Sequence, residues 1–291
     1  MNELLKKTAF LVLSCDKYEE AWLPYFLMFE KYWPDCCFNI YLATNTKKFD
    51  NKKISLKINM LFSNKFTTWS DETLTILKQI KEEYLIISLE DYFIYKKVNT
   101  SEIIKCLEIM EKENAVFFRL AVFPKKYDAW WPCTKINDFY GYIHPNSEYL
   151  VCLQIAIWRK SFLENLLVKE ENPYQFEING SNRARNLAKL NPNYFLCIIE
   201  RNKRYFLGPI TYYCTGITNG KWERKALKLL RKNNINFTPT QLQTKNFFEN
   251  IFTSFYIFLP LKLRRVLDKF LKISNNFIKA ELIKLSKKFF K

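Results

Sequence analysis

Two acidic residues stand together at the end of an apolar run, where their side chains are well suited to hold a metal ion. Glu90 and Asp91 directly follow residues 84–89, Tyr-Leu-Ile-Ile-Ser-Leu. Hard divalent cations prefer carboxylate oxygens, and Mg²⁺ commonly takes only one or two from a protein, with phosphate and water completing its shell. The pair therefore predicts a metal site that holds a diphosphate. Two surface acids beside a loop are the alternative.

Apolar runs alternate with helical patterns along the chain. The strands and helices that they indicate must position Glu90 and Asp91. The runs are typical of parallel strands buried on both faces, and the segments between them have the apolar spacing of helices. This alternation predicts an α/β fold with a mainly parallel sheet flanked by helices. In such sheets ligands bind at the carboxyl ends of strands, so Ser14, Cys15 and Asp16 are expected at the same edge as Glu90 and Asp91.

The expected elements can be given by their ranges. Strands are expected at 8–14, 38–43, 58–62, 84–89, 115–120, 154–159, 194–199 and 204–214. Helices are expected at 19–33, from Trp69 onward, and at 101–113, 160–168, 182–189 and 223–232. Residues 121–150, which are rich in Tyr, Trp and Pro, are expected as long loops or irregular strands.

Composition excludes several classes of protein. The 291 residues are 48% hydrophobic and 26% charged, which is globular and not disordered. Five glycines form neither GxGxxG nor GxxxxGK[ST], so two large classes of nucleotide-binding loop are absent. One histidine, His144, disfavours a Ser-His-Asp triad. The eight cysteines form no CxxC pair, and a reduced cytoplasmic compartment is expected.

The basic charge is concentrated towards the C-terminus. The net charge is +17, and residues 241–291 hold eleven Lys or Arg against three Asp or Glu. Apolar residues recur there with helical spacing, which is the pattern of an interfacial helix. No run reaches the ~20 apolar residues that span a bilayer. The predicted organisation is a catalytic domain at 1–234, a linker at 235–245 and a basic amphipathic tail at 246–291. The tail is expected to bind an anionic membrane surface, and a helix pair covering the domain is the alternative.

Several segments together resemble a known family. They are LSCDKYEEAWLPYFLMFEKYWPD with IYLATN, TTWSDE, YLIISLEDYFI, QIAIWRKSFLENLL and ENPYQFEINGS, in this order. The chain from residue 8 to about residue 222 resembles bacterial glycosyltransferases of capsule and lipooligosaccharide gene clusters, which have the GT-A fold. The resemblance implies a nucleotide-sugar donor, such as a UDP-sugar, and commonly Mn²⁺ or Mg²⁺. It does not name the sugar.

The resemblance also implies a donor site. Glu90-Asp91 resembles the family's Asp-x-Asp metal motif, with Asp91 as the principal ligand, although here the first acid is Glu and the two acids are adjacent. Ser14 and Asp16 stand where the fold seats the base and ribose, and a helix cap is the alternative for Asp16. Ser70 is a candidate phosphate donor at a helix N-terminus, or a simple N-cap. Three cations are candidates to offset the diphosphate charge, or else form ordinary ion pairs: Arg159, Arg119 and Lys221.

A catalytic base for an inverting transfer would be a carboxylate. Glu177 is the first candidate because it is an isolated acid in an apolar-aromatic segment beside a Gly-Ser turn, where burial would raise its pKa. An ion pair with Arg183 or Arg185 is the alternative. Two other acids, in or near the aromatic loops, are weaker candidates: Asp128 and Asp138.

Aromatic residues are the candidates for acceptor binding. Trp130, Trp131 and Tyr142 could stack on sugar faces, and packing under loops is the alternative for each. The acceptor implied by the resemblance is a saccharide or lipid-linked saccharide at the inner membrane face.

Two rival functions remain open. A nucleic-acid-binding protein would use the basic tail, but no helix-turn-helix, RNP-type or zinc motif is present, which disfavours nucleic acid as a partner. A metal-dependent nucleotidyltransferase also uses carboxylates at strand ends.

Overall fold

A computed structural model describes residues 3–50, 52–64, 67–121, 132–199 and 208–246. The chain divides into two compact units. The first unit contains residues 1–215 and 233–235, and the second contains residues 216–232 and 236–291. Each unit is described by itself.

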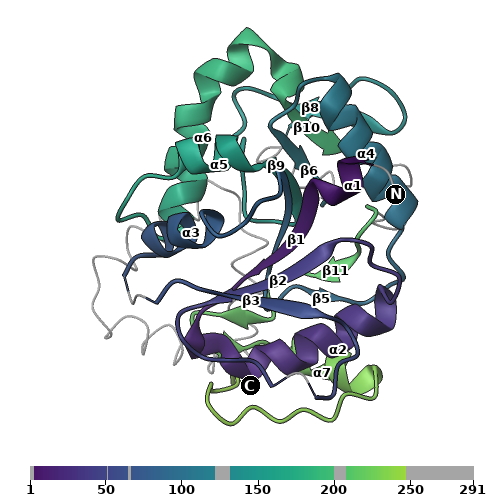
Figure 1. Cartoon of the computed structure of the whole chain (residues 1–291), viewed down its shortest axis with the longest axis vertical. Coiled ribbons are helices and arrows are strands. Elements are labelled where there is room, and N and C mark those ends of the chain that lie inside the picture. Colours follow the sequence, from purple (N-terminus) through teal and green to yellow (C-terminus); the bar gives the residue numbers. More distant parts are fainter. Residues whose placement is uncertain (1–2, 51, 65–66, 122–131, 200–207, 247–291) are drawn as a thin grey trace, which may run out of the picture. The chain divides into compact units, whose positions relative to one another are not determined.

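A mixed nine-stranded sheet forms the centre of the first unit, with strand order β3-β2-β1-β4-β9-β6-β10-β8-β7 (Figure 1). β8 and β9 run opposite to the other strands. The strands are β1 (Thr8–Leu13), β2 (Asn39–Thr44), β3 (Ile58–Phe62), β4 (Tyr84–Leu89), β6 (Phe117–Arg119), β7 (Cys133–Lys135), β8 (Tyr140–Ile143), β9 (Ala156–Arg159) and β10 (Phe195–Ile198). A separate two-stranded sheet pairs β5 (Phe93–Ile94) with β11 (Tyr212–Tyr213).

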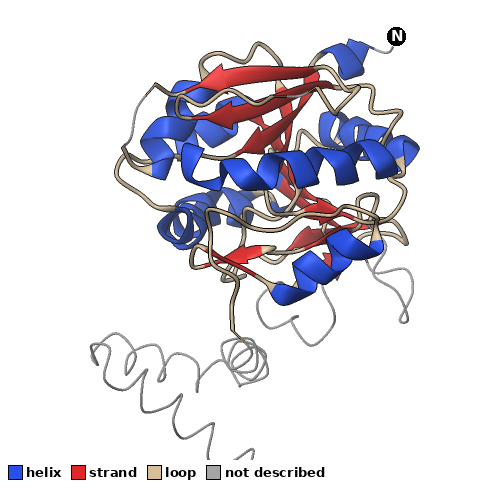
Figure 2. Ribbon diagram, turned by 90° about the horizontal axis from the view of Figure 1, so that it is seen from below, coloured by secondary structure: helices blue, strands red, loops and turns tan. Residues whose placement is uncertain are grey.

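Helices flank the central sheet on both faces, as Figure 2 shows. They are α1 (Glu3–Lys6), η1 (Asp16–Ala21), α2 (Trp22–Tyr32), α3 (Trp69–Leu77), α4 (Thr100–Lys112), α5 (Lys160–Leu166), α6 (Pro173–Leu190) and η3 (Pro192–Tyr194). The predicted α/β class, with a mostly parallel sheet flanked by helices, is confirmed.

The alternation of side chains along β1 explains why the strand is apolar throughout. Ala9 and Leu11 belong to a core cluster that also contains the buried residues of α3, α5 and α6. Phe10 points to the opposite face, where its ring meets Phe29 and Trp33 of the α2 segment at centroid distances of 5.1 and 5.5 Å. Because successive side chains of a strand point to opposite faces, a strand covered on both sides reads as a continuous apolar run.

The middle of the chain agrees with the sequence prediction in one part and departs from it in another. The segment 121–150, expected as long loops or irregular strands, contains the short strands β7 and β8 at one end of the sheet. The helix expected at 182–189 is longer and begins at Pro173, after an Asn172 capping box with Gln175. Gly180 and Ser181, expected as a turn, lie inside α6.

The direction of β9 could not be predicted from its apolar pattern. β9 lies between β4 and β6 and is antiparallel to both, with Ala156 opposite Ile87 and Arg159 opposite Tyr84. The residues that precede β9 are therefore at the carboxyl edge of β4, and Arg159 is at the amino edge.

The second unit is built around Trp222. Asn219 and Gly220, both with positive φ, join β12 (Ile217–Thr218) to β13 (Lys221–Trp222) in a two-residue hairpin. The Trp222 ring contacts Phe237 at 5.0 Å, and its backbone N–H donates to Gln243 O at 2.8 Å. α7 (Arg224–Lys232) completes the described part of this unit.

The predicted tail, 246–291, lies outside the described residues except for Asn246. None of the helices within the described ranges combines the length and the apolar character of a membrane-spanning helix.

Candidate functional site

The carboxyl ends of β1 and β4 are neighbours at one edge of the central sheet. The two strands pair in parallel with Leu13 opposite Leu89, so Ser14 and Glu90 are the first residues beyond a shared edge. The segment before β9 reaches the same edge because β9 is antiparallel. We call the side chains gathered there the candidate site: Ser14, Cys15, Tyr18, Glu90, Asp91, Tyr92, Gln154, Tyr174, Glu177, Tyr212 and Cys214.

The acidic pair is almost completely enclosed by protein. Glu90 and Asp91 are 7% and 6% exposed. Burial, and next the charge of Asp91, raise the pKa of Glu90 well above its ordinary value, although a hydrogen bond with the Ser14 hydroxyl opposes this rise. Two adjacent buried carboxylates cost free energy until a cation or a proton neutralises one of them.

The residues present fit a divalent cation that shares its shell with a ligand. The two acids offer oxygen ligands, which suit Mg²⁺ or Mn²⁺. Over the described ranges, no group of three or more His, Cys, Asp or Glu side chains is placed to hold a metal. The described protein ligands therefore supply only part of a shell, and phosphate and water oxygens are the usual complement.

Glu177 lies on α6 and has the raised pKa expected from the sequence. Its Oε1 accepts a hydrogen bond from Leu153 N at 2.8 Å. Burial nevertheless raises the pKa of Glu177 to about 7. The alternative ion pairs do not form: Arg183 binds Glu171 through two hydrogen bonds of 2.8 and 2.7 Å, and Arg185 donates to Pro145 O. A carboxyl group with this pKa can take up a proton near neutral pH.

The charges of Asp91 and Glu177 affect the pKa values of the same two side chains. Burial, and after it the charges of both carboxylates, raise the pKa of Tyr174. Burial also raises the pKa of the Cys214 thiol. The charges of Asp91 and Glu177 raise it further, and hydrogen bonds with Thr215 and Gln154 oppose the rise. Tyr174 is 74% exposed and Cys214 is exposed, so both are partly surrounded by protein and still reach solvent. The two carboxylates therefore lie close enough to Tyr174 and Cys214 for their charges to affect both side chains.

Gln154 joins three of the other site residues. Its Nε2 donates to the Tyr92 hydroxyl at 3.1 Å, and its Oε1 accepts from the Tyr212 hydroxyl at 2.7 Å and from the Cys214 thiol at 3.3 Å. The rings of Tyr92 and Tyr212 stack at 5.1 Å. This uncharged network fixes Tyr92, the residue next to Asp91, from two sides.

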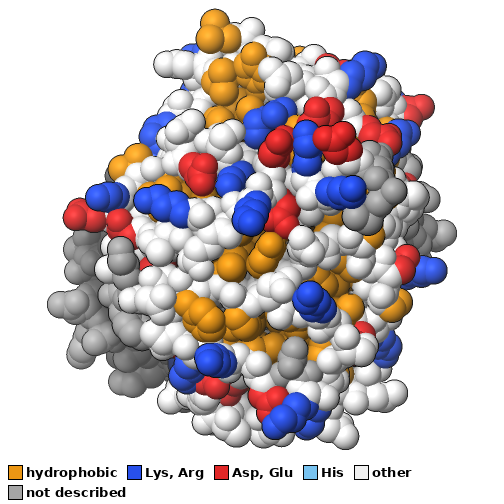
Figure 3. All heavy atoms as spheres, in the orientation of Figure 1, with side chains coloured by type: hydrophobic (Ala, Val, Ile, Leu, Met, Phe, Trp, Pro, Cys, Tyr) orange, Lys and Arg blue, Asp and Glu red, His pale blue; other side chains and the backbone are white. Residues whose placement is uncertain are grey.

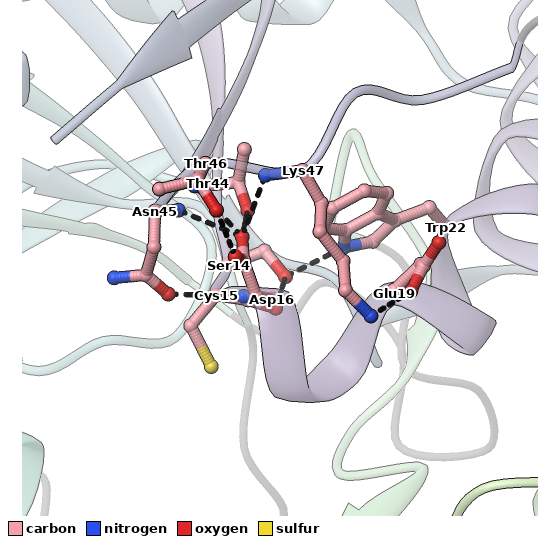
Figure 4. A network of polar contacts seen from close by, with 9 residues as sticks. All are labelled: Ser14, Cys15, Asp16, Glu19, Trp22, Thr44, Asn45, Thr46 and Lys47. Atoms are coloured by element: carbon pink, nitrogen blue, oxygen red, sulfur yellow. Dashed lines mark hydrogen bonds and ion pairs between the residues drawn. The ribbon is translucent and has the colours of Figure 1, made fainter. Parts of the chain in front are cut away.

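The Asp16 carboxylate accepts hydrogen bonds from other residues of the protein. Its Oδ1 accepts hydrogen bonds from the Thr44 hydroxyl at 2.7 Å and from three successive backbone N–H groups, those of Asn45, Thr46 and Lys47, at 3.0–3.1 Å. Its Oδ2 accepts from the Thr46 hydroxyl at 2.7 Å (Figure 4). Asp16 therefore ties the loop after β1 to the loop after β2. The ribose contact stays a prediction, and Oδ2 is the atom with remaining capacity for it.

We expect Asp16→Asn to destabilise the fold by about 1–3 kcal/mol, because it removes a charged acceptor shared by five donors. Burial opposes ionisation, but the hydrogen bonds from Thr46, Lys47 and Thr44 outweigh it and hold the pKa of Asp16 well below its usual range. This stabilisation is present above the unfolded pKa of about 3.9 and is lost as pH falls below it. Urea unfolding at pH 7 and pH 3.5 measures the difference, and equal stability at pH 7 would contradict the role.

Ser70 is not free to act as a phosphate donor, because its hydroxyl is buried and hydrogen-bonded. It is fully buried in the first turn of α3, and its Oγ accepts from Glu171 N at 3.0 Å. Ser70 N also donates to Glu171 O at 3.2 Å. The N-cap position of α3 is Thr68. Ser70 thus joins α3 to the segment before α6, which leaves no room for a phosphate on its hydroxyl.

Arg159 is also far from the acidic pair. It lies at the amino edge of β4, where its guanidinium donates to Asn114 Oδ1 at 3.3 Å and lies 5.1 Å from the centre of the Tyr84 ring. The two edges of β4 are five residues apart, from Tyr84 to Leu89, and this separates Arg159 from the acidic pair by about 16 Å. The prediction that Arg159 offsets the donor charge does not agree with this position, because the antiparallel β9 ends at the amino edge of β4. Arg119 is buried and donates to Cys133 Sγ at 3.0 Å.

The acceptor candidate Tyr142 is not at this site. Tyr142 lies on β8 opposite Leu196 of β10, four strand positions from β4, about 19 Å. Trp130 and Trp131 lie outside the described residues. Sequence reasoning missed Gln154, Tyr92 and Cys214. Only Gln154 carried a signal, as a polar residue opening an apolar strand at the edge where ligands bind.

Comparisons with known proteins give structural similarity at low sequence identity. No family model matches the chain, and a search of curated proteins found no match. A UDP-glucose pyrophosphorylase complexed with UDP-glucose aligns with 11% identity over 79% of this chain and 98% of its own, at a TM-score of 0.47. S. aureus TarS 1-349 in complex with UDP aligns with 13% identity over 80% of this chain and 67% of its own, at a TM-score of 0.43.

A third similar structure is CMP:2-keto-3-deoxy-manno-octonic acid synthetase complexed with CTP, with 12% identity over 66% of this chain and 88% of its own, at a TM-score of 0.43. The chain spans 40% of a longer TarS structure.

Proposed function

We propose that the protein is a glycosyltransferase that moves a sugar from a nucleotide-sugar donor, such as a UDP-sugar, to a saccharide acceptor. One observation carries the proposal. Asp91 of the buried Glu90–Asp91 pair and Glu177, whose pKa burial raises to about 7, affect the same two exposed side chains, Tyr174 and Cys214, at one edge of the sheet. One carboxylate pair suits a cation with a diphosphate, and the third carboxylate suits proton removal from a hydroxyl.

The proposed reaction is a direct displacement. The acceptor hydroxyl oxygen forms a bond to C1 of the donor sugar, and the bond from C1 to the diphosphate oxygen breaks. The hydroxyl proton passes to Oε2 of Glu177, since Oε1 is held by Leu153 N. The nucleoside diphosphate leaves with the electron pair of the broken bond. A cation bound by Asp91 and Glu90, when present, offsets the charge of the leaving diphosphate.

A nucleotidyltransferase is the second candidate, and two features make it the weaker one. It would bind a triphosphate, which protein loops commonly cradle with backbone N–H groups of a Gly-rich segment. The loop after β1 contains no glycine, and the three N–H groups of Asn45–Lys47 that converge on one point already bind Asp16. Glu177 favours the first candidate, because removing a proton from a hydroxyl needs a base.

We propose that the acceptor is a saccharide or lipid-linked saccharide of the capsule or lipooligosaccharide type. The enzyme would reach it from the cytoplasmic face of the inner membrane. The basic amphipathic pattern of 246–291 supports this location through attraction to anionic headgroups. Nucleic acid is not proposed as a partner.

We expect one family of nucleotides to raise the thermal unfolding midpoint of the purified protein, and Mn²⁺ or Mg²⁺ to increase the effect. A ligand at 100 times its Kd stabilises the native state by about 2.7 kcal/mol. Nucleoside diphosphates and nucleotide sugars are screened with and without each metal. Release of nucleoside diphosphate from a stabilising nucleotide sugar supports the transferase. Pyrophosphate formation from a triphosphate and a sugar phosphate would support the nucleotidyltransferase, and no shift with any nucleotide would contradict both.

A further inference from the structure

The second unit presents one strongly basic helix face. α7 buries Ala226, Leu227 and Leu230. Its five cations are all exposed, and we call them the basic face: Arg224, Lys225, Lys228, Arg231 and Lys232. At 100° per residue they fall within an arc of about 120° opposite the buried side. The basic face is therefore a compact row of cations on a packed helix.

The basic face has no acidic partner within its own segment. Residues 224–246 contain no Asp or Glu. On the face of the molecule shown in Figure 3, Lys and Arg side chains are interspersed with Asp and Glu side chains. Like charges three or four residues apart weaken a helix by a few tenths of a kcal/mol per pair, and cations in the first turn oppose the helix dipole. The face therefore costs stability in the free protein, and an anionic partner would remove that cost.

The packing of the second unit holds the face in place. Glu223, the acid that precedes α7, forms a buried ion pair with Lys245 and is unavailable to the cations of α7. Arg224 Nε donates to Lys245 O at 3.0 Å, which ties the first turn of α7 to residues 236–246. Leu229 is half-buried beside the cations, and no aromatic residue lies within α7 for base stacking. These features fit an anionic lipid surface better than a single-stranded nucleic acid.

We propose that the basic face of α7 binds the headgroups of an anionic membrane. The contact is separate from the predicted tail because it uses a folded helix that buries its apolar side in the protein, so its cations meet headgroups without inserting. It extends the proposed function by orienting the folded second unit towards the membrane. The binding itself does not depend on the reaction, so vesicle binding and nucleotide binding can fail independently.

The test uses the full chain carrying K225E, K228E and R231E together. The matched control carries K53E, K57E and K189E, three exposed lysines of the first unit, and changes the net charge equally. Co-sedimentation is measured with vesicles of phosphatidylcholine and phosphatidylglycerol in a ratio of about two to one, and with phosphatidylcholine alone. Each cation near such a surface is worth about 1 kcal/mol, so we expect the α7 variant to bind the anionic vesicles on the order of 100-fold more weakly.

The expected pattern is a large loss for the α7 variant, a small loss for the control, and no difference at high salt. Thermal unfolding verifies that both variants fold, and K225Q with K228Q and R231Q is the milder substitute if charge reversal prevents folding. Equal losses in the two variants would show only an effect of net charge and would overturn the proposal. Retained vesicle binding with loss of binding to a single-stranded RNA would instead identify the face as a nucleic-acid site.

Discussion

Asp91→Asn is expected to lower sugar transfer by at least about 10³-fold while the protein stays folded. The carboxylate oxygen that suits a cation becomes an uncharged amide, and offsetting charge on a leaving diphosphate is worth several kcal/mol. Because Asp91 and Glu90 are adjacent and buried, removing one charge relieves their repulsion. The unfolding midpoint at neutral pH should therefore stay unchanged or rise.

The matched control for this substitution is Asp138→Asn. Asp138 is exposed and pairs with Lys135 on the surface, so its loss removes the same charge at no functional cost under the proposal. Transfer is followed by release of nucleoside diphosphate at several metal concentrations. Near-normal transfer by a folded Asp91→Asn protein would refute the metal assignment, and a loss of transfer in Asp138→Asn would revive its candidacy as the base.

Glu177→Gln is expected to lower kcat by 10²- to 10⁴-fold, the range of a lost general base. In the wild-type protein, kcat/KM should rise with pH along a limb centred near pH 7, because burial raises the pKa of Glu177 to about 7 and only the ionised form accepts a proton. That limb should be absent from the residual activity of the variant. Glu108→Gln, an exposed acid on α4, is the control and should keep the wild-type profile.

The same substitution should stabilise the fold at high pH. A folded pKa above the unfolded value of about 4.5 means that protonation favours folding, so stability is full below pH 4.5 and is lost as pH rises through 7. Glutamine stays neutral, so Glu177→Gln should gain on the order of 2–3 kcal/mol at pH 8 and almost nothing at pH 4.5. A lower activity with a higher midpoint at pH 8 separates a catalytic role from simple unfolding.

The first half of the fold was largely predictable from sequence. β1 and β4 are buried along nearly their whole length, so their runs are largely apolar, and the alternation of β1 to β4 with helices is plain. Short strands were not predictable: β5 and β11 each have two residues, and Asn219-Gly220 was the only turn signal for the β12–β13 hairpin. α6 was underestimated because Gly180 and Ser181 suggest a turn. In the structure Gly180 packs near Phe176 and Leu166, and the Ser181 hydroxyl binds the Val151 backbone.

The sequence could locate only those site residues that directly follow a parallel strand in the chain. Ser14, Glu90 and Asp91 follow parallel strands, so the rule that ligands bind at carboxyl ends locates them. Arg159 was misplaced because an apolar run does not encode strand direction. Gln154 and Tyr212 are 58 residues apart, and only the folded chain brings them together.

The insertion of β9 between β4 and β6 also determines the order in which the sheet can form during synthesis. β1, β2, β3 and β4 are complete once residue 89 has been made, yet the partner on the free side of β4 is β9, which begins at Ala156. The nascent chain must therefore carry the open edge of β4, an apolar strand, through the synthesis of nearly 70 further residues. β6 emerges earlier but waits for β9 as well. Exposed strand edges are a common origin of aggregation, so the interval between β4 and β9 is where a chaperone would be most needed.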